Sequence, residues 1–154
     1  MAVRVQPEPF DLAGEVEMLR AGRTDLGAVV TFTGCVRDSA GGQRLVAMTL
    51  EHYPGMTEAE LARVEAEAAA RWPLAASLIV HRVGRLVPGD DIVLVVTASA
   101  HRAAAFEAAD FLMDYLKTSA PFWKQEELAD GTVNWVEAKA SDEDAAGRWL
   151  GKPE

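Results

Sequence analysis

The chain contains a single cysteine, Cys35, among its 154 residues. One thiol cannot form an intramolecular disulfide, and a zinc or iron–sulfur site of the CxxC type needs a pair of cysteines. No apolar run approaches the roughly 18 residues that a membrane helix requires, and the start, "MAVRVQPEPF", lacks the apolar core of a signal peptide. We therefore expect a cytoplasmic protein with no metal site and no membrane partner.

Basic residues are in short supply. Lysine and arginine number 15 against 24 aspartate and glutamate residues, so the formal net charge is −9. Proteins that bind nucleic acid or anionic membranes usually carry a basic surface, and we expect neither here. The chain is 49% hydrophobic and 25% charged, which is ordinary for a globular protein. Its length indicates one domain, 1–154. The acidic net charge still leaves room for a local basic pocket.

Four segments carry apolar residues at helical spacing. They predict two main helices, over 54–73 and 101–118, and two shorter ones, from about Asp11 to 21 and over 141–150. Thr57 followed by Glu60 matches the capping-box pattern at the start of the first. Ser141 followed by Asp144 matches the same pattern in the last, and Ser99 is a candidate N-cap for the second.

Runs of apolar and β-branched residues predict strands over 27–37, 44–53, 76–84 and 91–99. Gly41 and Gly42 lie between the first two runs and indicate that these strands form a hairpin. Asp130 and Gly131 lie between two further strand-like runs and predict a C-terminal hairpin. Together these elements predict an α+β fold, with a mostly antiparallel sheet on which two main helices pack.

The stretch "DYLKTSAPFWKQEE" places Lys117 at the end of a predicted helix and Lys124 just after the break at Pro121. A lysine at a helix C-terminus is favoured by the macrodipole and needs no function to explain it. Here, however, Phe122 and Trp123 stand between the two lysines. An aromatic wall desolvates a nearby ammonium group, which makes an amine a better nucleophile or base. The stretch is therefore a candidate catalytic segment.

Two basic residues, His101 and Arg102, open the same helix. Basic groups at a helix N-terminus oppose the macrodipole, and a local rule broken without evident gain is a hint of function. Helix N-termini also bind anions, so with Arg102 added this site would suit a phosphate. A solvated first turn is the alternative, and the dipeptide alone does not decide between them.

Arg37 ends the first predicted strand at a glycine-rich loop. Such strand ends are frequent places for ligand contacts, although a charged residue where a strand meets water needs no function. Glu126 follows Lys124 by two residues, so on a strand both side chains lie on one side. Glu126 is then either a salt-bridge partner or a residue that orients Lys124.

Other chemically active residues have structural explanations. Cys35 lies inside a strand pattern, where free cysteine is most often a small buried hydrophobe. His52 and His81 are lone histidines in predicted strands, and we assign them no role. Asp110 and Asp114 are one helical turn apart, a spacing that can bind a metal but is more typical of a solvated face.

Long and unusual stretches run in order from about Phe10 to Trp149: "GAVVTFTGCVR", "LEHYPGMTE", "RWPL", "HRVGRLVPGD", "SAHRAAAFEAADFLMDYLKTSAPFWKQE" and "WVEAKASD". In these stretches the chain resembles the large, catalytic subunits of molybdopterin synthase. The resemblance implies an α+β domain of the α/β-hammerhead type. It also implies a sulfurtransferase that converts cyclic pyranopterin monophosphate to molybdopterin by placing sulfur on two adjacent carbons.

The resemblance implies partners as well. The family's catalytic subunits form a homodimer, and each binds a small ubiquitin-like subunit whose C-terminal Gly-Gly carries a thiocarboxylate, which gives a heterotetramer. The thiocarboxylate supplies the sulfur, so Cys35 need not carry it. No cofactor is expected, because the pterin is the substrate. We expect strand edges and the Phe122–Trp123 region to help form the channel for the partner's narrow glycine tail.

Lys117 and Lys124 correspond to the family's essential lysines and are the expected catalytic pair. The expected substrate-binding residues are Cys35, Val36, Arg37, His101, Arg102, Lys117, Lys124, Gln125 and Glu126, with Phe32, Met113 and Lys139 as further candidates. Among them, Arg37, His101 and Arg102 are expected to hold the phosphate and the pterin. Lys139 stands where some family members have arginine, a change that keeps the charge but loses the bidentate fork.

Two other functions are compatible with these residues. A non-catalytic module for an anionic pterin or nucleotide would bind its ligand without turnover and would tolerate Lys117→Arg, which keeps the charge. An adaptor for a ubiquitin-like protein would bind its partner whether or not the tail carries sulfur. The complete set of matching basic residues favours the enzyme over both.

Overall fold

The computed structural model describes residues 1–136 and 140–150. In these ranges the elements follow the order β1 (Ala2–Gln6), α1 (Leu12–Arg20), β2 (Ala28–Cys35), β3 (Ser39–Ala40), β4 (Gln43–His52), α2 (Met56–Arg71), β5 (Leu74–Arg82), β6 (Gly84–Leu86), β7 (Asp91–Ser99), α3 (Arg102–Thr118), β8 (Phe122–Leu128), β9 (Val133–Val136) and α4 (Ala140–Gly147). The α+β prediction is therefore confirmed. None of the helices in the described ranges is long and apolar enough to cross a membrane.

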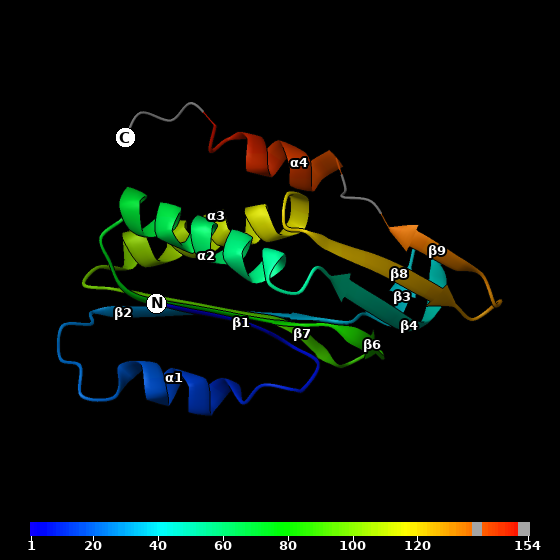
Figure 1. Cartoon of the computed structure of the whole chain (residues 1–154), viewed down its shortest axis with the longest axis horizontal. Coiled ribbons are helices and arrows are strands. Elements are labelled where there is room, and N and C mark those ends of the chain that lie inside the picture. Colours follow the sequence, from blue (N-terminus) through cyan, green and yellow to red (C-terminus); the bar gives the residue numbers. More distant parts are fainter. Residues whose placement is uncertain (137–139, 151–154) are drawn as a thin grey trace.

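The first sheet has the strand order β1-β5-β7-β2, and helices cover both of its faces, with α2 and α3 above and α1 below in Figure 1. Alternation along the central strands sends Ile79 and Val95 into the core under α2 and α3, whereas Val80 and Leu94 face α1. Because both faces of the sheet are covered, the middles of β5 and β7 are apolar on both sides, as in residues 78–80 and 92–96. β1 runs parallel to β5, and β5 and β2 each run antiparallel to β7, which lies between them.

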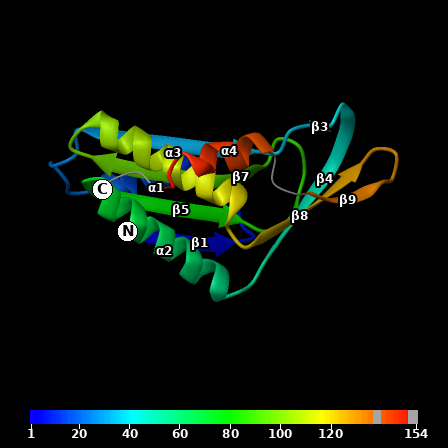
Figure 2. The ribbon, with the colours of Figure 1, turned by 90° about the horizontal axis from the view of Figure 1, so that it is seen from above.

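The second sheet extends beyond one end of the first, as an arm seen clearly from above (Figure 2). Its strands follow the order β3-β4-β8-β9, and β6 pairs with β4. The predicted C-terminal hairpin is confirmed, since β8 and β9 pair across Asp130 and Gly131. The Asp130 carboxylate accepts a hydrogen bond from the Thr132 N–H at 2.8 Å, and Gly131 has a φ of 88°, which glycine adopts at no steric cost.

β2 and β4 lie in different sheets, so the hairpin predicted between them is wrong. β2 pairs with β7, and its register shifts at Cys35, where the chain begins to leave the first sheet. The Val36 N–H then donates to the Asp90 carbonyl at 2.9 Å. Gly41 and Gly42 turn the chain from β3 into β4, with φ values of 58° and 81°. The glycine pair is a true turn signal, but the strand before it is two residues long.

The predicted capping box of α2 is also wrong, because Thr57 lies inside the helix. The N-cap is Gly55, whose N–H donates to the Glu58 carboxylate at 2.7 Å. The buried Thr57 hydroxyl accepts from the Tyr53 N–H at 2.9 Å and donates to the Pro121 carbonyl at 3.1 Å. Thr57 therefore ties the start of α2 to the chain break that precedes β8.

Ser99 does not cap α3. Its hydroxyl donates to the Pro73 carbonyl at 2.8 Å, and the residue at the N-cap is His101, which makes no side-chain capping bond. α3 therefore begins at Arg102. The last predicted helix is confirmed as α4, but the side chain of Ser141, on which its proposed capping box depends, lies outside the described residues.

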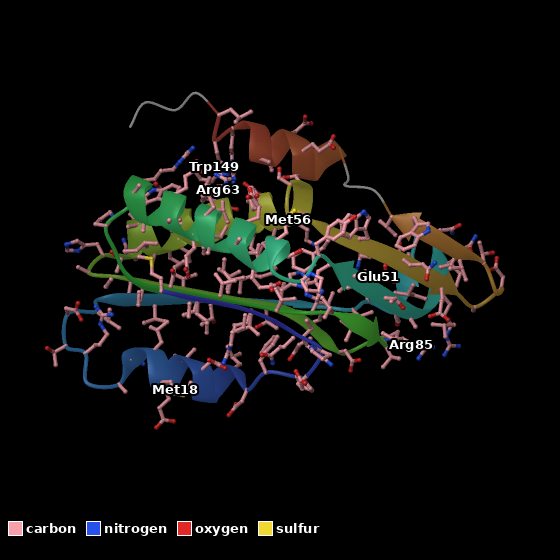
Figure 3. The ribbon with its side chains drawn as sticks, in the orientation of Figure 1. Met18, Glu51, Met56, Arg63, Arg85 and Trp149 are labelled. Atoms are coloured by element: carbon pink, nitrogen blue, oxygen red, sulfur yellow. The ribbon has the colours of Figure 1, made fainter. Side chains whose placement is uncertain are left out.

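The residues that follow α4 complete the core above the first sheet. The Trp149 ring meets Phe111 and Trp72 edge to face, with ring centroids 5.6 and 5.5 Å away. Its indole N–H donates to the Asp114 carboxylate at 2.6 Å, and its carbonyl accepts from Arg71 at 3.1 Å. Figure 3 shows Trp149 on the α2–α3 side of the molecule, far from α1. These contacts hold α4 against α3.

Candidate functional site

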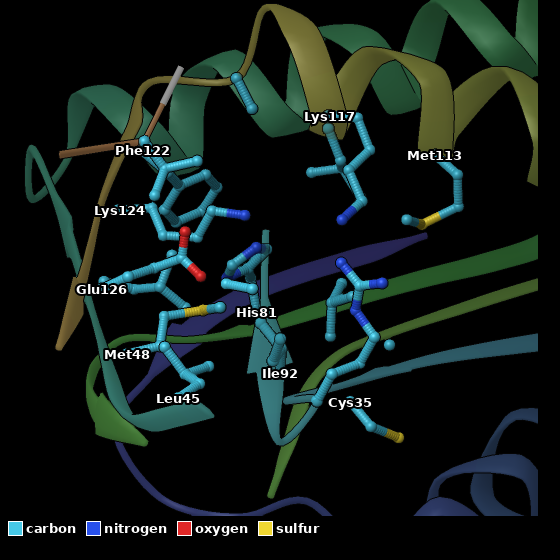
Figure 4. Close-up of a pocket in the computed structure, with 18 of the residues that line it drawn as sticks. Cys35, Leu45, Met48, His81, Ile92, Met113, Lys117, Phe122, Lys124 and Glu126 are labelled. Carbon is cyan, nitrogen blue, oxygen red and sulfur yellow. The ribbon is translucent and has the colours of Figure 1, made fainter. Parts of the chain in front are cut away.

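A cavity of about 580 Å³ lies where the two sheets meet, under the C-terminal end of α3 (Figure 4). Its apolar floor includes Leu45, Met48 and Ile92. The charged side chains that line it are Arg37, Lys117, Lys124 and Glu126. The cavity is therefore cationic in a chain whose net charge is −9, and such a pocket favours an anionic ligand.

Lys117 and Lys124 reach the cavity from two different elements. α3 ends at Thr118, whose hydroxyl donates to the Asp114 carbonyl at 2.8 Å. Proline stops the helix at Pro121 because it cannot supply a backbone N–H, and β8 begins at the next residue. Because the chain reverses direction between α3 and β8, the exposed Lys117 and the half-buried Lys124 line the same cavity.

Alternation along β8 decides which of its residues face this space. Phe122, Lys124 and Glu126 line the cavity, as the two-residue spacing predicts for the last two. Trp123 and Gln125 lie on the opposite face of the strand. The Trp123 ring packs edge to face on Tyr53, with centroids 4.6 Å apart. Of the two aromatic residues between the lysines, Phe122 therefore lines the cavity and Trp123 does not, and Gln125 is placed away from the cavity.

The end of β2 contributes the opposite wall. Phe32, Cys35 and Arg37 line the cavity, and Met113 lines it from α3. Val36, also expected at the site, is instead buried in the small core of the second sheet, with 3% of its surface exposed. The wall therefore offers one exposed guanidinium group, at the point where the chain passes from one sheet to the other.

Cys35 does not have the environment of a reactive thiol. Its Sγ lies 3.4 Å from the Asp91 carboxylate. A hydrogen bond to this carboxylate, together with burial and the negative charge, raises the pKa of the Cys35 thiol. A raised pKa leaves less thiolate at neutral pH, and thiolate is the nucleophilic form. The residue is exposed, so the prediction of a buried strand cysteine is wrong, but the prediction of an unreactive one is supported.

His101 and Arg102 do not reach the cavity of their own chain. They are exposed at the start of α3, whereas Lys117 lies near its end. Lys117 lies fifteen positions after Arg102 on the same helix, which is a rise of about 22 Å at 1.5 Å per residue. The expectation that Arg37, His101 and Arg102 hold one ligand together is therefore not met within a single chain. Lys139 lies outside the described residues.

His81 is a cavity residue to which the sequence assigns no role. It belongs to β5, and 7% of its surface is exposed. Its ring stacks on Phe122, with centroids 3.9 Å apart and an angle of 18° between the planes. Burial lowers the pKa of His81 to about 4, and the positive charges of Lys117 and Lys124 act in the same direction. A lone histidine in a strand carries no signal of function in the sequence. The one clue is strand alternation, which places His81 on the same face of β5 as Ile79, the face turned toward α2 and α3.

The carboxylates of Asp110 and Asp114 form ion pairs with Arg148, at the α3–α4 contact. They are therefore structural rather than metal ligands. In the described ranges, no group of three or more histidine, cysteine, aspartate or glutamate side chains is arranged to hold a metal ion.

Comparison with known proteins identifies the family. The family model described as MoaE protein matches residues 5–119. The molybdopterin synthase catalytic subunit of Mesorhizobium japonicum is 57% identical over 153 residues, which cover 99% of this chain and 95% of that protein. The corresponding subunit of Escherichia coli is 55% identical over 145 residues, which cover 94% and 95%. The solved structure of the molybdopterin biosynthesis MoaE protein from Burkholderia ambifaria matches with a TM-score of 0.82 and 49% identity, and the match covers 99% of this chain and 100% of that one. The chain therefore belongs to the MoaE family, whose members include the catalytic subunits of molybdopterin synthase.

Proposed function

We propose that this cavity transfers sulfur from the C-terminal thiocarboxylate of a small ubiquitin-like partner to cyclic pyranopterin monophosphate, and so builds the dithiolene of molybdopterin. The observation that carries the proposal is the convergence of Arg37, Lys117 and Lys124 in one cavity of an acidic chain. The cyclic phosphate and the thiocarboxylate are both anions, so both need cations supplied locally. The reaction is a cytoplasmic step of molybdenum cofactor biosynthesis.

Each charged residue of the cavity has a role in this reaction. Arg37 holds the phosphate, since a guanidinium group binds it in a bidentate manner. Lys117 lies beside the thiocarboxylate carbonyl, as a base or as a transient acyl acceptor. Attack of the sulfur on a side-chain carbon of the precursor breaks a carbon–oxygen bond there, which opens the cyclic phosphate or releases water, and the cations of the cavity stabilise the charge that develops on oxygen. The bond between the sulfur and the acyl carbon then breaks, and water takes up the acyl group, directly or after a transient amide with Lys117, so the tail returns to the carboxylate. Lys124, oriented by Glu126, stabilises the developing charge and transfers protons.

The partner's tail enters beside Phe122, which lines the cavity. Glycines have no side chain, so a Gly-Gly tail threads a narrow space that other C-termini cannot enter. The groups that this reaction uses come from the tail's sulfur, from water and from side chains of the two chains, without a resident metal or organic cofactor. The full assembly is a heterotetramer of two such chains and two partners.

The test combines purified chain, thiocarboxylated partner and precursor, and follows the products by mass spectrometry. We expect a product that carries both dithiolene sulfurs, together with partner whose tail has returned to the carboxylate. A control with the unmodified carboxylate tail yields no product. Binding of precursor and partner without any sulfur transfer would contradict the proposal and would favour the binding module or the adaptor.

His101 and Arg102 act in the cavity of the second copy of the chain. They are exposed, and α3 holds them about 22 Å from Lys117 of their own chain, so a homodimer can bring them to the other cavity. The two variants Lys117→Ala and Arg102→Ala are each expected to be nearly inactive. When they are mixed and the subunits exchange, half of the dimers contain one variant of each kind, and each of these has one intact site. Turnover should then recover to roughly a quarter of the wild-type value, as a statistical expectation for closed two-fold dimers.

Native mass spectrometry shows whether mixed dimers have formed. If they form and turnover does not recover, Arg102 does not act in the cavity of the second copy, and this assignment is wrong. A control mixture of Lys117→Ala with Lys124→Ala must stay inactive, because both residues line the same cavity.

Cys35 lines the cavity but takes no part in the chemistry. We expect Cys35→Ala to keep turnover within about a factor of two, since substitutions that remove no essential interaction change free energies by at most about 0.5 kcal/mol. The reason is the raised pKa of the Cys35 thiol beside Asp91, together with a sulfur supply from the partner. The sulfur-transfer assay with thiocarboxylated partner and precursor measures this turnover. Loss of most product, with an unchanged melting temperature, would show that Cys35 carries sulfur.

A further inference from the structure

The segment "HYPGMTE", residues 52–58, forms a closed turn at the start of α2, which we call the α2 turn. The Thr57 N–H donates to the Tyr53 carbonyl at 2.9 Å, and the Tyr53 N–H donates to the Thr57 hydroxyl oxygen at 2.9 Å. Gly55 lies between them with a φ of 86°, a conformation that favours glycine. The Glu58 carboxylate accepts from the Gly55 N–H at 2.7 Å. The residues of the α2 turn are therefore fixed to one another by hydrogen bonds.

Pro121, at the break between α3 and β8, is held by the α2 turn. Proline has no N–H, so its carbonyl is the only backbone group through which it can form a hydrogen bond. This carbonyl accepts from the Thr57 hydroxyl at 3.1 Å, and Thr57 is fully buried. The Phe122 N–H donates to the Ala120 carbonyl at 2.8 Å, so the chain makes a three-residue turn centred on Pro121. Thr57 therefore anchors the middle residue of this turn.

The next two residues of the chain are held by the α2 turn as well. His52 pairs with Phe122 between β4 and β8. The Tyr53 ring packs edge to face on the Trp123 ring, with centroids 4.6 Å apart. Three consecutive residues that precede Lys124 are therefore each held by one residue of the α2 turn.

The break at Pro121 decides how the two lysines of the cavity stand relative to each other. Lys117 lies one residue before the end of α3, and Lys124 is the third residue of β8. Both line the cavity, as Figure 4 shows. A shift of about 1 Å in a catalytic group can slow a reaction about 100-fold. A break without an anchor would let the two amine groups adopt many relative positions.

We infer that Thr57 is a positioning residue, whose hydroxyl fixes the break at Pro121 and so sets the position of Lys124 relative to Lys117. Thr57 lies outside the cavity lining, so it acts through Lys124 and not on the substrate. The inference rests on the proposed function in so far as the two lysines serve one reaction. If the hydroxyl served only the stability of α2, its loss would lower the melting temperature and leave the turnover of the folded protein unchanged.

The first test uses the free protein and needs no activity. Thr57→Val keeps the shape of the side chain but removes the hydroxyl. In amide hydrogen exchange followed by NMR, the N–H groups of Tyr53 and Phe122 should exchange at least about tenfold faster than in the wild type. The first group loses its acceptor, and the second lies in a turn that has lost its anchor. Thr57→Ser keeps the hydroxyl and should restore slow exchange at both positions.

Ser77→Ala is the matched control for this measurement. It also removes a buried hydroxyl that binds α2, since Ser77 donates to the Glu65 carboxylate at 2.6 Å. Glu65 lies about two helical turns after Thr57, so the exchange of the Phe122 N–H should stay as in the wild type. Wild-type exchange of the Phe122 N–H in Thr57→Val would overturn the inference, and this outcome does not depend on whether the protein transfers sulfur.

The second test is kinetic and uses thiocarboxylated partner and precursor, at a temperature below the melting temperature of every variant. Thr57→Val should lower kcat by about tenfold to a hundredfold, the usual effect of a misplaced catalytic group. KM for the precursor should stay within about twofold, since the cavity lining is unchanged. Thr57→Ser should recover most of kcat, and Ser77→Ala should keep it.

Tyr53→Leu is a second variant, which removes the ring that packs on Trp123. Tyr53 is exposed, so the fold should tolerate the change, and kcat should fall while KM stays the same. Normal kcat in Tyr53→Leu and Thr57→Val, a loss confined to KM, or an equal loss of kcat in Ser77→Ala would overturn the inference. If the wild type itself transfers no sulfur, the proposed function fails, and the exchange measurement still decides whether Thr57 holds the break.

Discussion

Lys117→Ala is expected to lower the turnover of sulfur transfer by at least about 100-fold, the lower end of what a positioned acid–base group contributes. The substitution removes the ammonium group that reaches into the cavity from the end of α3, and Lys124 cannot replace it because it approaches from β8. The fold should be unaffected, since Lys117 is exposed. Single-turnover assays with thiocarboxylated partner measure the loss.

Two comparisons sharpen this result. Lys117→Arg keeps the charge but not the nucleophilic amine, so it should remain strongly impaired if Lys117 is an acyl acceptor or a base. Near-normal turnover of Lys117→Arg would reduce the role of Lys117 to charge alone. Arg20→Ala removes a cation from the exposed side of α1, on the other face of the sheet, and should leave turnover unchanged.

The largest effect on stability is expected for Leu112→Ala. Leu112 is fully buried on α3, in the core cluster that also holds Ile79 and Leu61. Removing three carbons there leaves a cavity, which costs about 2–5 kcal/mol of unfolding free energy. For a chain of this size a loss of about 3 kcal/mol corresponds to a fall in Tm of roughly 6–12 °C. Denaturant unfolding and thermal unfolding both measure it.

Phe106→Ala is the matched control, because it lies on the same helix and 60% of its surface is exposed. It should change the unfolding free energy by no more than about 0.5 kcal/mol. If the two variants lost similar stability, the packing of α3 on the sheet described above would be wrong.

The main helices and the central strands could be predicted from sequence because each is long and strongly patterned. The pairing of those strands could not, since it depends on contacts between distant segments. β2 and β4 follow one another along the chain and carry a good turn signal at Gly41, yet β2 pairs with β7 and β4 with β8. β1 is five residues long, and its parallel partner β5 lies about 70 residues further on, so local pattern gives no sign of it.

Some residues of the candidate site could likewise be predicted from sequence, and others could not. The convergence of Lys124 and Glu126 follows from strand alternation, and their meeting with Lys117 follows from the proline break at Pro121. His81 could not be found, because what distinguishes it is the set of neighbours brought by three other elements. The family resemblance predicted His101 at the same site. In the structure His101 lies at the N-terminal end of α3, and Lys117 lies near the C-terminal end of the same helix.

Trp149 has a consequence for the order in which the protein matures. In the part of the chain that the structure describes, the nine strands and the three larger helices precede residue 137, but the aromatic cluster of Trp72 and Phe111 closes only when Trp149 is added. During synthesis the ribosome covers the most recently made part of the chain. A nascent chain that already has these strands therefore still exposes part of its core, and that part is shielded from proteases and chaperones only after Trp149 has emerged from the ribosome.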